Sequence, residues 1–332
     1  MKQQGGFCMS FRTARQHLVG RALFLIAAAL IGIASCQHLA AQITFGPLIF
    51  MGTTEKLANT ASPTLITFNG QLYLFYVNSS NSTIYVDVGL TGRPASTGLV
   101  VYSGGLSDVG AAVLDGNNIL LTYIAPNQVP MAALTPNGTT ITSNVAINTA
   151  STGFNSLFVP TPVAVGPDVF LSIVGNGNYV YLYETFNGTS FGYLHQESGY
   201  STISRPAMAD GPSGLWIGFT TQTSGGRQAI VGPDQALKLV PGYYCGQNTH
   251  DGAYAGLGLL EYGGAVYAFS QNTLTVQDAQ YVFTNNGGAS WSGLYEPGNQ
   301  MRWTPSLTLD GGTVFFIYQD DDNTNMTYRT GT

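Results

Sequence analysis

Two arginines stand at the start of strand-like phrases, where a fold can bring them to one place. Arg205 precedes Pro206, and Arg302 precedes Trp303. A guanidinium is always charged and presents a planar fork of N–H donors that matches a carboxylate. An indole adds an apolar ring face and one N–H. These three side chains are therefore candidates for binding a polar ligand.

Glu184 and Glu261 are rare acids inside strand-like stretches. A retaining glycosidase places two carboxyl groups about 5 Å apart. In the repeat pattern described below the two glutamates fall two repeats apart. The sequence alone does not bring them together.

The segment 243–252 reads Tyr-Tyr-Cys-Gly-Gln-Asn-Thr-His-Asp-Gly and is dense in polar and aromatic residues. A pair such as Cys245 and His250 can serve as a nucleophile or bind a metal. No second cysteine or suitably spaced histidine supports zinc, so we favour a structural loop. As a loop that contacts a ligand, it offers Tyr243, Tyr244, His250 and Asp251.

A second polar run, Asp320 to Asn323, has the oxygen groups that Ca²⁺ prefers. The spacing of an EF-hand loop and its closing glutamate are absent. The matching segment of the first repeat, 78–82, carries no charge. We therefore favour a solvated loop, and the sequence indicates no cofactor.

A repeated phrase supplies the elements that would position these residues. In its first copy, strand-like stretches at 62–68 and 71–76 meet at Asn69-Gly70, a favoured hairpin turn. A third stretch follows at 83–87. The glycines that mark the turn in successive copies are Gly70, Gly116, Gly166, Gly211, Gly263 and Gly311. A unit of about 48 residues with several strands predicts a propeller blade.

The two ends of the repeat region complement each other. The sixth copy stops after its third strand, at 326–329, and the segment 43–51 precedes the first copy without a blade of its own. We expect this segment to complete the last blade, since pairing there closes the ring and covers an edge. The sequence predicts an all-β, six-bladed β-propeller over 42–332 as a single domain. The segment 99–102 is expected to be the outer strand of the first blade.

Composition agrees with this fold class. Glycine accounts for 42 of 332 residues, and only 8% of residues are charged, against about 25% in typical soluble domains. The net charge is −6, which is the wrong sign for a protein that binds phosphate backbones. We therefore expect no nucleic-acid partner.

The N-terminal segment has the pattern of an export signal. Three arginines precede an apolar run over 22–34, which is short for a membrane span. The run ends in Ile-Ala-Ser-Cys at 33–36 and resembles a lipobox, in which Cys36 is lipidated. We expect 1–36 to be a signal peptide of a bacterial cell-envelope lipoprotein, periplasmic or at the surface. Cleavage after Ala41, giving a secreted protein, is the alternative.

One turn carries a family resemblance. The stretch from Thr284 to Trp291 resembles the Asp-box of sialidase-like propellers, also called the BNR repeat, with Asn286 where the family usually has aspartate. Weaker versions occur at 185–191 and 136–139. The resemblance implies a structural role for Thr284, Asn286, Gly288 and Trp291, and no part in catalysis.

The same resemblance implies which residues a catalytic member of the family would need. Sialidases bind the substrate carboxylate with three arginines and use a tyrosine nucleophile, a glutamate and an acid/base aspartate. The first arginine of the family falls where this sequence reads Ala61-Ser62-Pro63. The arginines after the leader are Arg93, Arg205, Arg227, Arg302 and Arg329. Neither a third binding arginine nor a Tyr/Glu pair can be assembled.

Three functions remain open, because fold alone does not decide function. We favour a lectin-like surface protein, since weakly charged loops rich in Asn, Gln, Tyr and Trp suit sugars. The alternative is an exo-acting glycoside hydrolase of the sialidase type, and the third is a protein-interaction scaffold. We expect a monomer with a glycan partner that meets the membrane only through its lipid anchor.

Overall fold

The hairpins of the blades are set by turn residues that accept a positive φ. Asn69 and Gly70 have φ values of 52° and 70°, and Gly311 and Gly312 have 54° and 83°. Two consecutive positive φ angles define the tight turn whose twist matches antiparallel strands. The Asn-Gly and Gly-Gly pairs therefore fold the phrases of blades one, five and six back on themselves.

The computed structural model describes most of the chain after the leader. The described residues are 42–51, 61–90, 106, 108–221, 227–240, 256–271, 278–297, 300–320 and 325–332. They belong to one compact unit, 40–332. No helix among them is long and apolar enough to span a membrane.

The strands form six antiparallel sheets, which are the blades. Blade one consists of β2 (Thr64–Phe68), β3 (Gln71–Val77) and β4 (Ile84–Val88). Blade two consists of β5 (Val109–Leu114), β6 (Asn118–Ile124), β7 (Pro130–Thr135) and β8 (Ser143–Ala146). Blade three consists of β9 (Thr161–Val165), β10 (Asp168–Val174), the 3₁₀ turn η1 (Asn176–Asn178), β11 (Tyr179–Thr185) and β12 (Gly192–Ser201).

The second half of the ring has the same order. Blade four consists of β13 (Ala207–Gly211), β14 (Gly214–Thr220), β15 (Gln228–Val231) and β16 (Leu237–Leu239). Blade five consists of β17 (Gly258–Tyr262), β18 (Ala265–Gln271) and β19 (Ala279–Thr284). Blade six consists of β20 (Met301–Asp310), β21 (Thr313–Asp320), β22 (Met326–Gly331) and β1 (Ile49–Phe50).

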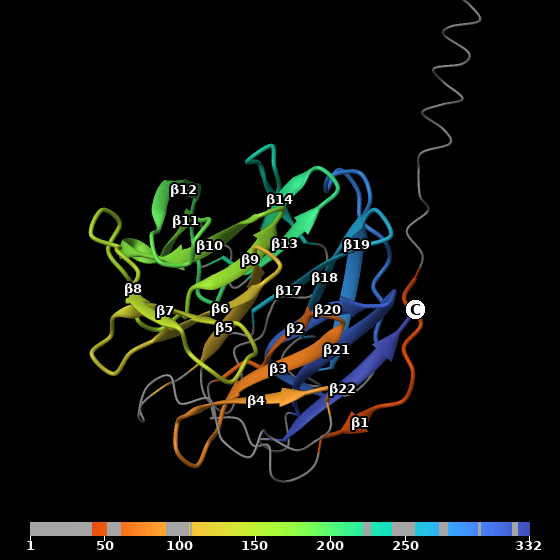
Figure 1. The fold of residues 1–332 in the computed structure, drawn as a ribbon. Coiled ribbons are helices and arrows are strands. Elements are labelled where there is room, and N and C mark those ends of the chain that lie inside the picture. The colour runs from red at the N-terminus through yellow and green to blue at the C-terminus, as the bar shows by residue number, and fades with distance from the viewer. Residues whose placement is uncertain are drawn as a thin grey trace, which may run out of the picture. The chain divides into compact units, whose positions relative to one another are not determined.

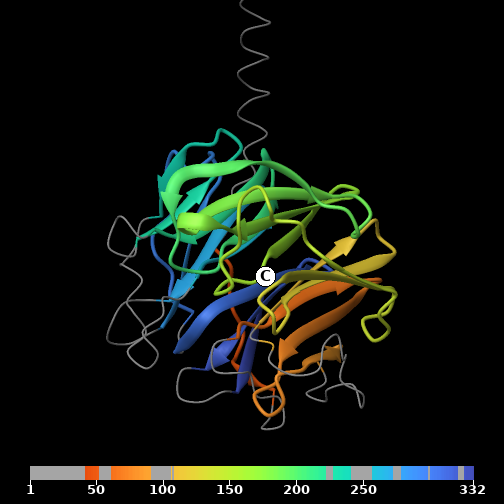
Figure 2. The ribbon, with the colours of Figure 1, turned by 90° about the vertical axis from the view of Figure 1, so that its left-hand side faces the viewer.

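The predicted ring closure is confirmed. Strand β1 pairs antiparallel with β22, with Ile49 opposite Tyr328 and Phe50 opposite Thr327. In both ribbon views the blue C-terminal strands lie beside the orange strands of blade one (Figure 1, Figure 2). The N-terminal segment thus completes the last blade, and the all-β, six-bladed propeller is the fold of this protein.

One turn lies two residues from its expected place. Asp210 and Gly211 belong to β13, and the hairpin of blade four turns at Pro212 and Ser213. A Cβ atom on Gly211 would lie 2.5 Å from Cδ1 of Trp216. Glycine is required here by the close packing of the indole and not by the turn. The expected outer strand at 99–102 lies outside the described residues.

The blades pack through aromatic side chains, and the N-terminal segment contributes one of them. The Phe45 ring lies 5.8 Å from that of Phe316 and 6.0 Å from that of Phe269, between blades five and six. The hydroxyl of Tyr281 donates to the carbonyl of Ile43 at 2.9 Å. Aromatic pairs at such distances add to the free energy of burial. Closure therefore depends on side-chain packing as well as on the short β1–β22 ladder.

We expect Phe45→Ala to lower the free energy of unfolding by about 2–3 kcal/mol, because it removes a partly buried ring from the closing interface. Urea denaturation measures the change. Phe50→Ala is the control: its ring is 62% exposed, and we expect a change within about 0.5 kcal/mol. Equal effects of the two substitutions would contradict a special role for Phe45 in closure.

Candidate binding site

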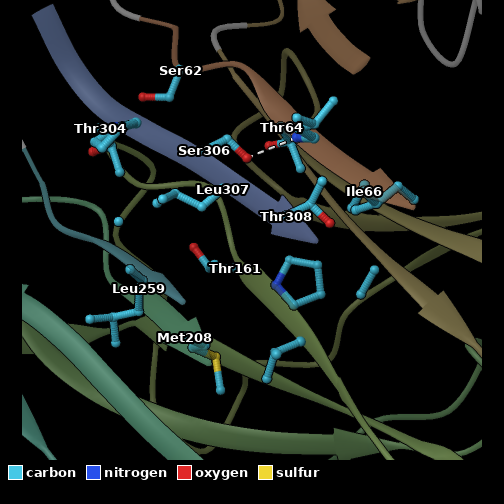
Figure 3. A pocket seen from close by; sticks show the side chains of 18 of the residues that line it. Ser62, Thr64, Ile66, Thr161, Met208, Leu259, Thr304, Ser306, Leu307 and Thr308 are labelled. Atoms are coloured by element: carbon cyan, nitrogen blue, oxygen red, sulfur yellow. Dashed lines mark hydrogen bonds between the residues drawn. The ribbon is translucent and has the colours of Figure 1, made fainter. Parts of the chain in front are cut away.

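A cavity of about 290 Å³ runs along the propeller axis between the inner strands of all six blades. Figure 3 shows apolar side chains such as Met208, Leu259 and Ile66 on its wall. Hydroxyl groups of Ser62 and Thr304 lie together at one end of the view. The cavity wall is therefore mixed, with apolar side chains beside hydroxyls such as those of Thr161 and Thr308.

Several hydroxyls in the wall join one blade to the next. The amide of Leu65 donates to Ser306 Oγ at 2.8 Å, between blades one and six (Figure 3). The hydroxyl of Thr64 donates to the carbonyl of Val109 at 2.7 Å, between blades one and two. These bonds satisfy backbone groups that face the axis, where buried polar groups need a partner.

Arg205 crosses the start of two neighbouring blades. From blade four, its Nη1 donates to Asp108 Oδ2 at 2.7 Å and to the carbonyl of Val109 at 3.1 Å, both in blade two. Its Nε donates to Thr161 Oγ1 of blade three at 3.0 Å. About 10% of the Arg205 side chain is exposed. The guanidinium is therefore engaged by the protein itself.

Asp108 is the partner that the sequence did not reveal. Its Oδ1 accepts hydrogen bonds from the amides of Ser62 at 3.2 Å and Val109 at 2.8 Å. Burial raises the pKa of Asp108 above its ordinary value, although the neighbouring Arg205 and these bonds oppose the rise. The only feature of the sequence that points to Asp108 is its position directly before an inner strand.

The start of β20 is irregular at Trp303. The register passes from Arg302 opposite Gln319 to Ser306 opposite Ile317, which is four residues along β20 against two along β21. Trp303 in this bulge has a φ of 62°. Such backbone strain in a bulky residue costs on the order of 1–3 kcal/mol, and bulges are frequent next to functional sites.

The Trp303 side chain is also unsatisfied. It is 6% exposed, and its Nε1 has no hydrogen-bond partner among the described residues. A buried donor without an acceptor costs about 1–3 kcal/mol. The guanidinium carbon of Arg302 lies 5.8 Å from the ring centroid, within the range of a cation–π contact. The next residue, Thr304, lines the cavity.

The two glutamates do not join this group. Glu184 lies at the far end of β11, one residue before the turn that begins at Thr185. Glu261 lies near the far end of β17, and its Oε1 accepts the amide of Gly264 at 2.9 Å in the hairpin turn. Arg205 lies two residues before the start of its inner strand, β13. The acids therefore lie near the strand ends away from Arg205.

Several predicted site residues lie outside the described part of the chain. They are Cys36, Arg93, Tyr243, Tyr244, Cys245, His250, Asp251 and the run 321–323. Of the acidic run, only Asp320 is described, opposite Met301 in the sheet. Across the described ranges, no three His, Cys, Asp or Glu side chains gather as a metal site would require.

The Asp-box-like turn of blade five is closed by its own side chains. Asn286 Oδ1 accepts the amide of Ser290 at 2.9 Å and the hydroxyl of Thr284 at 3.0 Å. The amide of Gly288 donates to Thr284 Oγ1 at 2.9 Å. Trp291 packs on the hydrophobic cluster shared by blades four and five. The Oδ1 atom only accepts hydrogen bonds, so an uncharged asparagine replaces aspartate without losing these contacts.

Two other blades repeat this turn in shorter form. Asn187 Oδ1 accepts the amide of Ser190 at 2.9 Å, and Asn137 Oδ1 accepts that of Thr140 at 2.9 Å. Phe191 then packs on the cluster shared by blades two and three. These turns lie at the ends of the third strands, away from Arg205, so they shape the blades and not the candidate site.

We expect Arg205→Met to lower the free energy of unfolding at pH 7 by about 3–5 kcal/mol, because it leaves the buried Asp108 carboxylate without its cation. The pKa of Asp108 in the folded protein is already raised and should rise further. The folded variant then binds a proton at higher pH than the unfolded chain. Part of the loss should therefore return as the pH falls from 7 toward about 4.

Chemical denaturation across this pH range measures both effects. The control is the double variant Arg205→Met/Asp108→Asn, in which no charge is buried, and its deficit relative to the native protein should show no such recovery at low pH. A loss in Arg205→Met that is the same at every pH would contradict a charged Asp108 as its cause.

Comparison with known proteins shows likeness in structure and not in sequence. The sequence matches no protein-family model and no curated protein. A protein of unknown function from Dyadobacter fermentans has a TM-score of 0.66 at 10% identity, covering 87% of this chain and 98% of that one. A Hadza microbial sialidase has a TM-score of 0.60 at 13% identity, and the match covers 81% of this chain and 64% of the sialidase.

A lectin shares the fold as well. A variant of the Aleuria aurantia lectin in complex with α-methyl-L-fucoside has a TM-score of 0.55 at 10% identity, covering 83% of this chain and 93% of the lectin. At such low identity the likeness shows the fold alone. The chain has the six-bladed propeller fold shared by sialidases, by this lectin and by a protein of unknown function.

Proposed function

We propose that this protein binds carbohydrate without hydrolysing it, at the end of the propeller where the inner strands begin. One observation carries the proposal: the Arg205 guanidinium is held by Asp108, Val109 and Thr161. Bound in this way, it does not present a free fork to a substrate carboxylate. The strand-borne acids Glu184 and Glu261 are distant from it along their blades.

The surroundings suit a sugar. Hydroxyl side chains and an indole N–H offer the neutral donors and acceptors that sugar hydroxyls need, and apolar and aromatic groups suit the C–H faces of the rings. Among proteins of this fold, one is a lectin in complex with a fucoside and another is a sialidase. Both of these proteins are named for carbohydrates, which supports a glycan as the partner of this chain.

The test is a glycan array run beside a fluorogenic sialoside assay, with the body of the protein, residues 42–332, which contains every strand. We expect binding on the array and no turnover. Arg302→Met should weaken binding at least about tenfold, since it removes N–H donors for sugar hydroxyls beside Trp303. Lys238→Met is the matched control, because it removes a cation from the outer strand of blade four, where Lys238 pairs with Asp234.

Each contrary outcome has a distinct meaning. Sialoside turnover that Arg302→Met abolishes would contradict the proposal in favour of a hydrolase. Absence of both binding and turnover would contradict a carbohydrate function and direct attention to protein partners. Equal effects of Arg302→Met and Lys238→Met would mean that binding depends on net charge and not on this site.

We propose further that the protein is exported and tethered through a lipid on Cys36. Cys36→Ala should remove the lipid and move the protein from the detergent phase to the aqueous phase in Triton X-114 partitioning. Cys8→Ala is the matched control within the leader, and it should leave partitioning unchanged. A lipid-free N-terminus at Gln42, found by mass spectrometry of the native protein, would contradict the tether.

A further inference from the structure

Trp303 differs from every other described residue with a strained backbone. The other non-glycine residues with positive φ are Asn69, Ser82, Leu90, Asp115, Gln128, Asn178 and Gln235, and all of these lie in turns or connecting segments. Among the described non-glycine residues, Trp303 alone has a positive φ inside a strand. A left-handed backbone is unfavourable for a residue with a Cβ, so this conformation needs a cause.

Packing alone does not account for it, as a second tryptophan shows. Trp216 is 2% exposed, and its Nε1 also has no hydrogen-bond partner. Trp216 has no positive φ and lies in the regular strand β14, against Gly211 and Gly232. A buried indole in this protein thus does not require a strained backbone. At Trp303 the strain and the unsatisfied donor occur together.

The strained backbone and the unsatisfied N–H of Trp303 lie next to the candidate site. It follows Arg302 and precedes Thr304, which lines the axial cavity. The amide of Gly256 donates to Thr304 Oγ1 at 3.1 Å, which fixes the strand directly after the indole. The bulge supplies extra residues between Arg302 and Ser306. The backbone at Trp303 thus has spare length for a second conformation.

We propose that Trp303 is a ligand-operated latch, and that its ligand is a neutral saccharide. In the free protein the indole is buried with its N–H unsatisfied and its backbone strained. A saccharide bound beside Thr304 moves the indole outward, accepts its N–H on a ring or hydroxyl oxygen, and lets β20 relax. Binding selects the open state because both costs disappear there.

The charge of the ligand follows from the other side of the cavity. The Arg205 guanidinium already has Asp108 as its counter-ion at 2.7 Å. A ligand carboxylate at Arg205 would compete with the buried Asp108 carboxylate for the guanidinium. It would also be repelled by the negative charge of Asp108. A neutral saccharide needs only hydroxyl and N–H partners. This inference rests on the proposed carbohydrate function and adds the class of glycan and the moving part.

The protein has three tryptophans, Trp216, Trp291 and Trp303, so the latch can be observed directly. The body of the protein is labelled with 5-fluorotryptophan, and Trp303→Phe assigns the third ¹⁹F resonance. Methyl α-L-fucoside, lactose and 3′-sialyllactose are titrated in turn, together with the best ligand from the glycan array. We expect a neutral saccharide to shift the Trp303 resonance and leave the other two in place.

Two substitutions complete the test. Trp303→Phe keeps a ring and removes the N–H, and it should weaken binding about tenfold, the value of one hydrogen bond. Trp216→Phe removes the other unsatisfied buried N–H and should leave binding within about twofold of the native protein. The labelled native protein reports the movement without any substitution, so loss of folding in a variant does not remove the test.

The outcomes separate the latch from the function. Array binding with an unmoved Trp303 resonance would overturn the latch and leave the carbohydrate function standing. Binding of 3′-sialyllactose but of no neutral saccharide would overturn the ligand class. Equal losses in Trp303→Phe and Trp216→Phe would overturn the role of the Trp303 N–H. Absence of binding to every glycan on the array would overturn the proposed function and the latch with it.

Discussion

In the described part of the chain the six sheets share no ladder of backbone hydrogen bonds, so contacts between blades depend on side chains. This constraint shapes the composition. Near the axis the inner strands approach so closely that a Cβ on Gly258 would lie 3.0 Å from the carbonyl oxygen of Pro305 in the next blade. Small residues permit this approach, and hydroxyls such as Thr64 and Ser306 bridge the backbones. Low charge and abundant Gly, Ser and Thr follow from that geometry.

The ion pair of Arg205 and Asp108 is another side-chain contact that connects the blades. It links blade four to blade two, and Asp108 also accepts the amide of Ser62 in blade one. A buried ion pair adds little net stability when compared with apolar packing. Its value here lies in fixing how the starts of four blades are placed. That rigidity forms one side of the candidate site.

The sequence predicted the repeated blade and the closing strand because both follow from local patterns. Turn pairs such as Asn69-Gly70 and the unmatched segment 43–51 are visible in one dimension. Asp108 was missed because its meaning depends on Arg205, which is 97 residues away in sequence. Gly211 was misread as a turn residue because close packing against Trp216 leaves no local signal. The positive φ of Trp303 has none either, since tryptophan ordinarily avoids it.

Rigid and strained parts thus occupy the same end of the molecule. Blades one to four are joined there by the ion pair of Arg205 and Asp108 and its hydrogen bonds. Blade six holds the Trp303 indole, whose N–H has no acceptor among the described residues. In the proposed site an acidic ligand gains no free arginine at Arg205, whereas a hydroxylated ligand can accept the N–H of the buried Trp303 indole. In the function we propose, the internal pairing of Arg205 disfavours an acidic ligand, because the guanidinium already has Asp108 as its counter-ion.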